Sequence, residues 1–386
     1  MARGFLLLPG ALLVAQGCSL VLGDGGLSGG GGPLDGGLEG GFSRPPPSLV
    51  DCRDPNHSGD FACRTIETLE PGSVGQGPAP IWVQNSIRKL QVVGGAIHAG
   101  ELFLAVRSSE NLGQGGVLGV DLATGARRLV SGTLLTTEGS LTQGTGDNFA
   151  ELAGVGFGGG LFAHIWPEWG GFTGFIYDID AHSGDHTTRT IGDKCESALP
   201  QPLSKEGWIF PAVAPDTTVY LAAVNLQGEH IVRVLGDECD LFATLTLPGS
   251  LQSMRWQNGQ LWLVDNAGST LQSMDLSTGK TTAVSQTTPA VPGLEPITLG
   301  NQSVAVDGNT AWTVGSAFEG GFHLVEVNVA TGERKLHAED VGPARTNAYF
   351  PKHVFVHPTL AAVIVVMDGA VVLYDPATDE SNVLSY

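Results

Sequence analysis

The stretch IWPEWGGFTG, residues 165–174, concentrates the side chains of this chain that are best suited to hold a ligand. It places Trp166, Glu168 and Trp169 on one turn-rich segment. Tryptophan offers a large flat apolar surface, and a nearby carboxylate accepts hydrogen bonds from hydroxyl or ammonium groups. The segment therefore indicates a platform for a glycan or a peptide. The alternative is that both tryptophans fold back on a strand edge and have a structural role.

Three acidic residues on other loops are candidates to complete this platform. Glu110 lies in RSSENLGQGG, Asp265 in DNAGST and Glu319 in SAFEGGFH. We expect them to serve as polar partners from neighbouring loops, and we expect this acidic surface to repel an anionic ligand.

Two motifs with catalytic or phosphate-binding associations lack the context that such chemistry needs. GLSGG, residues 26–30, matches the nucleophile pattern G-x-S-x-G, but no strand precedes it and no helix follows. GVGFGG, residues 154–159, matches G-x-G-x-x-G, but the following LFAHIW is typical of a strand, and a phosphate cradle needs a helix there. We assign no catalytic residue to either motif.

Two clusters of metal-ligating residue types are also explained without a metal. DIDAHSGD, residues 178–185, offers three aspartates, but its spacing is wrong for a calcium loop and the segment fits a tight turn. His353 and His357 in HVFVHP point the same way along a strand, and four residues separate them by about 13 Å. We expect core or channel histidines, and we predict no metal site and no cofactor.

One turn recurs through the chain and defines its architecture. GVDLATGARRLV returns as SMDLSTGKTTAV, EVNVATGERKLH and LYDPATDESNVL, and DIDAHSGDHTTRTI is a further copy. An Asp or Asn opens each turn, where its side chain can accept a backbone hydrogen bond from two residues on. A Gly or Asp tolerant of positive φ closes it, at 125, 184, 279, 332 and 379. The flanks are short, apolar and rich in β-formers, so each copy predicts the tip of a β-hairpin.

The interval between 184 and 279 is about twice the others, which predicts a degenerate sixth copy near 236. HIVRVLGDECDLFATLTL supplies it, with Gly236 and Asp237 at the tip. Six units with a mean period of about 51 residues predict an all-β fold, a six-bladed β-propeller of four-stranded antiparallel sheets. Seven blades is the alternative. We place the units at 86–132, 149–193, 205–248, 251–286, 300–339 and 350–386, with four strands in the last unit and PIWVQ (80–84) at most an addition.

In QSVAVDGNTAWTVG and GQLWLVDNAGSTLQSMDLSTGKTTAV the chain resembles bacterial propellers of the NHL and lactonase-like type. The resemblance covers residues 86–386 and implies the fold alone, because propellers host hydrolases, lyases, oxidoreductases and pure binders. Lactonase-like enzymes hold a central metal with carboxylates and an Asn, and no residue-level match carries that set over.

The N-terminus predicts export. Arg3 precedes an apolar run over 5–15 that is too short to cross a bilayer, the layout of a secretory signal over residues 1–17. VAQGC, residues 14–18, resembles a bacterial lipobox, which implies lipidation of Cys18; the alternative is a plain signal peptide and a structural thiol. Because Ser19 and not Asp follows, the resemblance implies the outer membrane.

The remaining cysteines fit an oxidising compartment. Without Cys18 there are four, Cys52, Cys63, Cys195 and Cys239. The local pairing Cys52–Cys63 and Cys195–Cys239 is one of three possible connectivities. Residues 18–51 are predicted to be a lipid anchor and a disordered Gly/Pro-rich tether, residues 52–85 a cysteine-closed segment, and residues 86–386 the propeller.

The strongly acidic composition limits the classes of partner that the protein can bind. The net charge is −20, so nucleic acid is excluded as a partner, and the membrane is approached through the lipid anchor. These features predict an exported, outer-membrane-anchored binding or scaffold module for a glycan, a peptide or an envelope protein. The alternatives are a hydrolase or lyase that uses the central funnel, and an outer-membrane assembly factor.

Overall fold

The structure is a computed structural model that describes most of residues 75–385. Outside the described residues lie 1–74, 79, 81–82, 85–86, 89, 109–113, 137–138, 145–151, 159, 166–174, 191–194, 196, 199–202, 226–227, 237, 248–249, 266–269, 287–297, 317–321, 338–350, 368 and 386. The predictions for the signal sequence, the tether, Cys18, Cys52 and Cys63 fall there and stay predictions.

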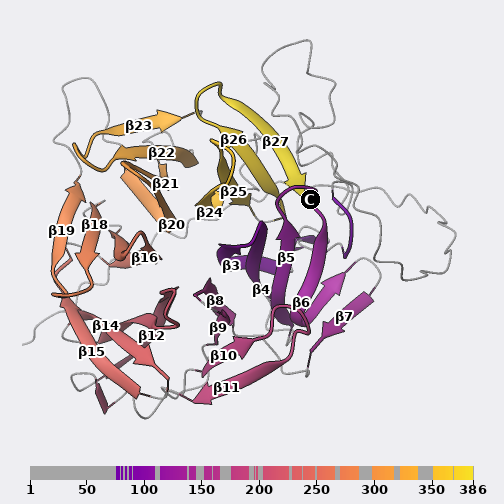
Figure 1. Cartoon of the computed structure of the whole chain (residues 1–386), viewed down its shortest axis with the longest axis horizontal. Coiled ribbons are helices and arrows are strands. Elements are labelled where there is room, and N and C mark those ends of the chain that lie inside the picture. Colours follow the sequence, from indigo (N-terminus) through magenta and orange to yellow (C-terminus); the bar gives the residue numbers. More distant parts are fainter. Residues whose placement is uncertain are drawn as a thin grey trace, which may run out of the picture.

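The described strands form six antiparallel sheets in a ring, which confirms the six-bladed β-propeller (Figure 1). Blade 1 contains β3 (Leu90–His98), β4 (Glu101–Ser108), β5 (Gly115–Asp121), β6 (Arg127–Thr136) and β7 (Gly139–Gln143). Blade 2 contains β8 (Leu152–Phe157), β9 (Leu161–Ile165), β10 (Phe175–Ile179) and β11 (His186–Thr190). Blade 3 contains β12 (Leu203–Val213), β13 (Val219–Asn225), β14 (Gly228–Leu235) and β15 (Glu238–Leu245). Blade 4 contains β16 (Leu251–Gln257), β17 (Gln260–Asp265), β18 (Thr270–Asp275) and β19 (Thr281–Ser285). Blade 5 contains β20 (Thr298–Asp307), β21 (Thr310–Ser316), β22 (Phe322–Asn328) and β23 (Arg334–His337). Blade 6 contains β24 (Pro351–Val356), β25 (Val363–Met367), β26 (Val371–Asp375) and β27 (Glu380–Ser385).

The first blade differs from the prediction of four strands in every sheet. β7 pairs with β6 and adds a fifth strand at the outer edge of blade 1. Its sequence, GSLTQ, is polar and short, so it has the composition of a loop, and its pairing with β6 decides its structure. Outside the blades, β1 (Val83–Gln84) pairs with β2 (Ile87–Arg88), and Pro80 forms an isolated bridge with Thr136 of blade 1. The last blade takes its four described strands from residues 351–385, without a strand from this segment.

The core is divided into six apolar clusters, one at each junction between neighbouring blades. The reason is the two-residue period of a strand with both faces buried. On β4, Leu102 and Leu104 belong to the cluster shared with blade 6, whereas Phe103 and Ala105 belong to the cluster shared with blade 2. Strands in the middle of a blade therefore contain nearly continuous apolar runs.

The repeated turn has the predicted conformation in every described copy. Its closing residues all have positive φ, from 60° to 80°. In blade 1, Asp121 Oδ1 accepts hydrogen bonds from the main-chain nitrogens of Ala123 and Thr124, at 2.9 and 2.7 Å. The degenerate copy is present as well, because Gly236 has φ 60° between β14 and β15.

The turns also join the blades, which the repeat alone did not predict. A Cβ atom at Gly184 or Gly332 would clash with a main-chain carbonyl of the preceding blade's fourth strand, β6 or β19. The carbonyl oxygens of the same two glycines accept hydrogen bonds from Ser131 and Ser285 of those strands, both at 2.7 Å. Only glycine combines the positive φ with this close approach.

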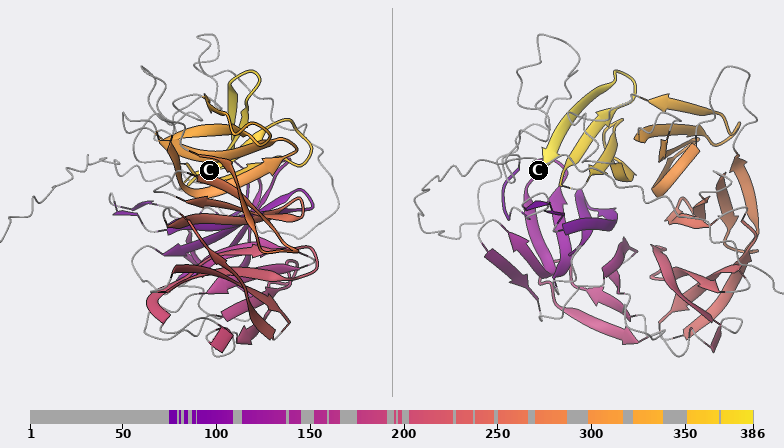
Figure 2. Two further views of the ribbon diagram at one scale, coloured as in Figure 1. Left: turned by 90° about the vertical axis from the view of Figure 1, so that its left-hand side faces the viewer. Right: turned by 180° about the vertical axis from the view of Figure 1, so that it is seen from behind.

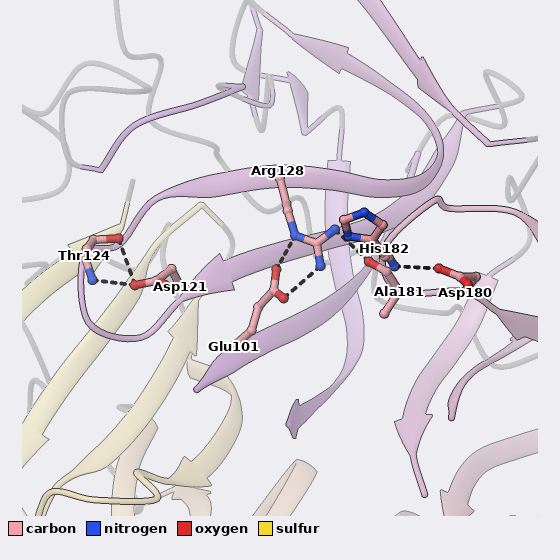
Figure 3. Close-up of polar contacts among 7 residues, drawn as sticks. All are labelled: Glu101, Asp121, Thr124, Arg128, Asp180, Ala181 and His182. Carbon is pink, nitrogen blue, oxygen red and sulfur yellow. Dashed lines mark hydrogen bonds and ion pairs between the residues drawn. The ribbon is translucent and has the colours of Figure 1, made fainter. Parts of the chain in front are cut away.

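The adjacent arginines Arg127 and Arg128 have structural roles at these junctions. The Arg128 guanidinium donates to both carboxylate oxygens of Glu101, at 2.7 and 2.8 Å, and to the Ala181 carbonyl at 2.7 Å. Figure 3 shows Arg128 between Glu101 of blade 1 and the blade 2 turn that carries Asp180. Arg128 therefore links two neighbouring blades.

Arg127 lies where the ring closes. The view from behind in Figure 2 shows the last blade (yellow) beside the first (purple). Arg127 Nη1 donates to Ser385 Oγ at 3.0 Å, and its Nε donates to the Pro78 carbonyl at 2.9 Å. Its main-chain nitrogen donates to the Gln76 carbonyl at 2.6 Å. One buried arginine thus holds the C-terminal strand and the segment before the propeller on blade 1.

The Cys195–Cys239 disulfide is present as predicted, with 5.0 Å between the two Cα atoms. Cys195 is fully buried in the cluster between blades 2 and 3, and Cys239 packs against that cluster. Helical conformation within the described part of the chain is confined to residues 195, 197 and 198. In that part no helix is long and apolar enough to cross a bilayer.

Candidate functional site

A cavity of about 270 Å³ lies at the centre of the ring, where the innermost strand of every blade contributes to its wall. These strands are β3, β8, β12, β16, β20 and β24. The ring topology places residues from six separate parts of the sequence around one space, as is usual for ligand sites in closed β architectures.

Small residues form one side of the wall. A Cβ atom at Gly94 on β3 would lie 3.0 Å from the Cα of Gly154 on β8. On the next pair of strands, a Cβ atom at Gly154 would lie 2.8 Å from the ring of Pro211 on β12. Gly154 and Gly156 of the GVGFGG motif are therefore explained by the close packing of inner strands, and β8 runs through both of them as a strand.

The opposite side is polar and is built on β16. Ser253, Arg255 and Gln257 alternate along this strand, so they share one of its faces. The Gln257 side chain forms two hydrogen bonds with the main chain of Val306 on β20 of the neighbouring blade. Its Oε1 accepts from the Val306 nitrogen at 2.8 Å, and its Nε2 donates to the Val306 carbonyl. This pairing fixes the face of β16 toward blade 5 and sets the direction in which Arg255 leaves the strand.

Arg255 reaches past blade 5 to blade 6. Its Nη1 donates to the carbonyl of Val354 on β24 at 3.1 Å, and its Cζ lies 4.4 Å from the centroid of the Phe355 ring. Ser303 on β20 donates to the same Val354 carbonyl at 3.1 Å. A cation above an aromatic face is attracted by the ring quadrupole, so the guanidinium is held in one place.

Arg255 has no carboxylate partner among the residues that the structure describes. No Asp or Glu belongs to the described lining of the cavity, although the whole chain has a net charge of −20. Burial lowers the pKa of Arg255 to about 10, so the side chain is still cationic at neutral pH. The centre of this acidic protein therefore holds a positive charge. A guanidinium has five N–H groups, and the hydrogen bond to Val354 uses one of those of Arg255.

The two histidines of HVFVHP lie apart, as their spacing predicts. His353 lines the central cavity, and its side chain is buried. His357 follows β24, and its Nδ1 accepts hydrogen bonds from the main-chain nitrogens of Thr359 and Leu360, at 3.3 and 3.1 Å. The described residues contain no group of three or more His, Cys, Asp or Glu side chains placed to hold a metal ion.

Asp180 of DIDAHSGD opens the repeated turn and bonds it with its side chain. Asp180 Oδ1 accepts hydrogen bonds from the main-chain nitrogens of His182 and Ser183, both at 2.8 Å. Asp178, Asp180 and Asp185 contribute to the wall of a second cavity of about 380 Å³, on the outer part of blades 2 and 3.

Of the six residues predicted for ligand binding, the structure describes one. Trp166, Glu168, Trp169, Glu110 and Glu319 lie outside the described residues, so the predicted platform stays a prediction. Asp265 ends β17 and is 1% exposed. Its charge lies close enough to Glu229 on β14 to raise the pKa of that carboxyl further, in addition to the larger effect of burial.

Sequence reasoning missed Arg255. A signal exists in SMRWQ, where a charged residue interrupts an innermost strand at a position within the predicted fourth unit. The repeat turns identified the hairpins, but they gave no indication of which inner-strand residues converge on the centre.

No protein-family model matches the chain, and no curated protein is similar to it in sequence. Solved structures do align with it. The nidogen/laminin complex aligns with a TM-score of 0.42 and 11% identity, covering 66% of this chain and 81% of the other. An inactive virginiamycin B lyase from Staphylococcus aureus with quinupristin aligns with a TM-score of 0.43 and 12% identity, and the alignment covers 76% of this chain and 94% of the lyase. Puromycin hydrolase aligns with a TM-score of 0.43 and 13% identity, and the alignment covers 81% of this chain and 57% of the hydrolase. Similarities this low indicate nothing about activity. The β-propeller assignment is based on the sheet topology of the chain itself.

Proposed function

We propose that this chain is an exported, lipid-anchored binding protein whose β-propeller takes a small molecule into its central cavity. The observation that carries the proposal is the placement of Arg255, which extends across the cavity from blade 4 to blade 6 with most of its N–H groups uncommitted. Convergent polar groups that orient a ligand in a concave site are a common feature of small-molecule sites.

The anchored location rests on the sequence. The signal layout over residues 1–17 and the lipobox-like VAQGC support export and lipidation at Cys18. The Cys195–Cys239 disulfide is compatible with an oxidising compartment. The tether over 18–51 would have a root-mean-square reach of about 30 Å between the membrane surface and the segment that precedes the propeller.

The binding half of the proposal is tested by filling the cavity. Val93 and Val356 line it from β3 and β24, and both are only partly buried, so their replacement by Phe takes up cavity space with little strain in the core. The wild-type protein, isolated gently from its native membranes, should carry a small molecule detectable by mass spectrometry, and the Val93→Phe/Val356→Phe variant should not.

A matched control is Thr188→Phe on the exposed outer strand β11. This variant should retain the same molecule as the wild type. If the filled variant retains it too, or if the wild type carries none, the central cavity is not the binding site.

A further inference from the structure

The central cavity has a charge that nothing in the described chain balances. Arg255 is the only fully charged side chain in its described lining, and it is partly buried. A partly buried cation without a counter-ion is solvated less well than a cation in bulk water. Pairing with an anion that enters the cavity would therefore be favourable.

The position of Arg255 also determines the shape of that anion. The hydrogen bond to Val354 and the contact with the Phe355 ring fix the plane of the guanidinium before any ligand arrives. A planar guanidinium presents parallel N–H groups that match the two oxygens of a carboxylate. Because the side chain is already ordered, binding loses little side-chain entropy.

The remaining lining selects an organic and singly charged molecule. Ile97 on β3 and Val356 on β24 are both partly buried and provide apolar surface in the lining. The volume of about 270 Å³ is just below the range of drug-sized pockets, so the ligand is small. A strongly charged anion would be repelled by a protein of net charge −20, whereas one carboxylate meets one arginine.

We propose that the central cavity binds a small organic monocarboxylate, whose carboxylate pairs with Arg255 while its apolar part contacts apolar residues that other inner strands contribute to the lining, among them Ile97 and Val356. This inference rests on the proposed function and names its ligand class. It does not involve the loop face, where the predicted acidic residues are expected to repel anions.

The test is calorimetric titration of the purified full-length protein with benzoate, with the neutral isostere benzamide and with inorganic phosphate. Benzoate should bind saturably at millimolar concentrations. Benzamide should bind at least about tenfold more weakly, because a charge-assisted bidentate pair is lost. Equal binding of benzoate and benzamide, binding of phosphate without benzoate, or no binding of benzoate overturns the carboxylate assignment.

The variant Arg255→Met keeps an apolar side chain of similar length and removes the charge. It should weaken benzoate binding at least about tenfold at unchanged benzamide affinity, and Arg255→Lys should restore part of the loss. The control is Arg233→Met, on the exposed Arg233–Asp240 pair of blade 3, which should bind benzoate as the wild type does. If Arg255→Met binds benzoate as tightly as the wild type, Arg255 only cross-links blades 4 and 6 and the inference fails.

The two proposals fail in different ways. The comparison of benzoate with benzamide needs no variant, so it remains decisive if Arg255→Met does not fold. A molecule captured with the wild type but lost from the filled-cavity variant, together with no benzoate binding, leaves the proposed function in place and removes only the ligand class. Retention of the captured molecule by the filled-cavity variant removes the proposed function whatever the benzoate result.

Discussion

Gly125 of the first blade packs directly against the carbonyl oxygen of Leu384 in the last strand, although the two residues lie at opposite ends of the propeller sequence. Gly125 closes the repeated turn with φ 70°, and a Cβ atom there would clash with that oxygen. The same turn that defines the repeat thus also closes the ring without any exchange of strands between the termini.

Replacing Gly125 by Ala should destabilise the protein more than replacing Gly236 by Ala. Both glycines have positive φ, but a Cβ atom at Gly236 would have nothing within 4 Å. We expect about 1–2 kcal/mol for the left-handed conformation in each variant, and roughly 1–3 kcal/mol more at Gly125 from the steric clash. Urea denaturation measures both. Equal losses would show that the contact with Leu384 is not a constraint.

Replacing Arg127 by Ala should loosen the closure of the ring. The variant loses the charged hydrogen bonds to Pro78 and Ser385, each worth about 1.5–3 kcal/mol. Faster proteolysis near residues 75–78 should accompany the loss of stability, because that segment is held by Arg127. Arg233→Ala, which breaks an exposed ion pair, should cost about 1 kcal/mol or less and leave the cleavage rate unchanged.

Glu229 predicts a dependence of stability on pH. Burial, with a smaller contribution from Asp265, raises the pKa of Glu229 in the folded protein. The folded state therefore favours the protonated carboxyl, so this contribution to stability is present at acidic pH and is lost as the pH rises through the folded-state pKa.

Glu229→Gln should accordingly raise the melting temperature at neutral pH and have little effect below about pH 4, where the wild-type carboxyl is protonated. The amide oxygen can still accept the hydrogen bond that Leu251 donates to Glu229 Oε1 at 2.8 Å. Thermal melts of both proteins across this pH range measure the difference. A variant that is less stable than the wild type at neutral pH would contradict the sign.

Cys18→Ser should release the protein from the membrane. The lipobox-like VAQGC predicts lipidation at Cys18, and a serine there removes the thiol that would be acylated. Fractionation should find the variant in the soluble fraction, while Cys52→Ser stays with the membranes. A Cys18→Ser protein that still partitions into membranes would contradict the lipoprotein prediction.

Trp166→Ala combined with Trp169→Ala tests the predicted loop platform. If these residues bind a glycan or a peptide, the double variant should keep its thermal stability and lose capture of envelope partners. Trp312→Ala is the comparison for a structural tryptophan, because Trp312 is buried in the cluster between blades 5 and 6 and its loss should lower the melting temperature. A double variant that melts as early as Trp312→Ala assigns the two tryptophans to the blade.

Residues adjacent in sequence determined the hairpins and the blade count. The turn from Asp121 to Gly125 forms because a carboxylate accepts main-chain hydrogen bonds two and three residues on and because glycine tolerates positive φ. These interactions are local, so the recurrence of the turn was sufficient to predict six units. The degenerate turn at Gly236 followed from the spacing.

Only the tertiary structure decided what meets at the centre and at the ring junction. Arg255 lies 99 residues from Val354, and Arg127 lies 258 residues from Ser385. Such pairs depend on how far each blade is rotated from the next and on side-chain packing over six junctions, and no local propensity carries that information. The polar face of β16 is visible in the sequence as an alternation, but its position beside a cavity without a carboxylate exists only once the ring has closed.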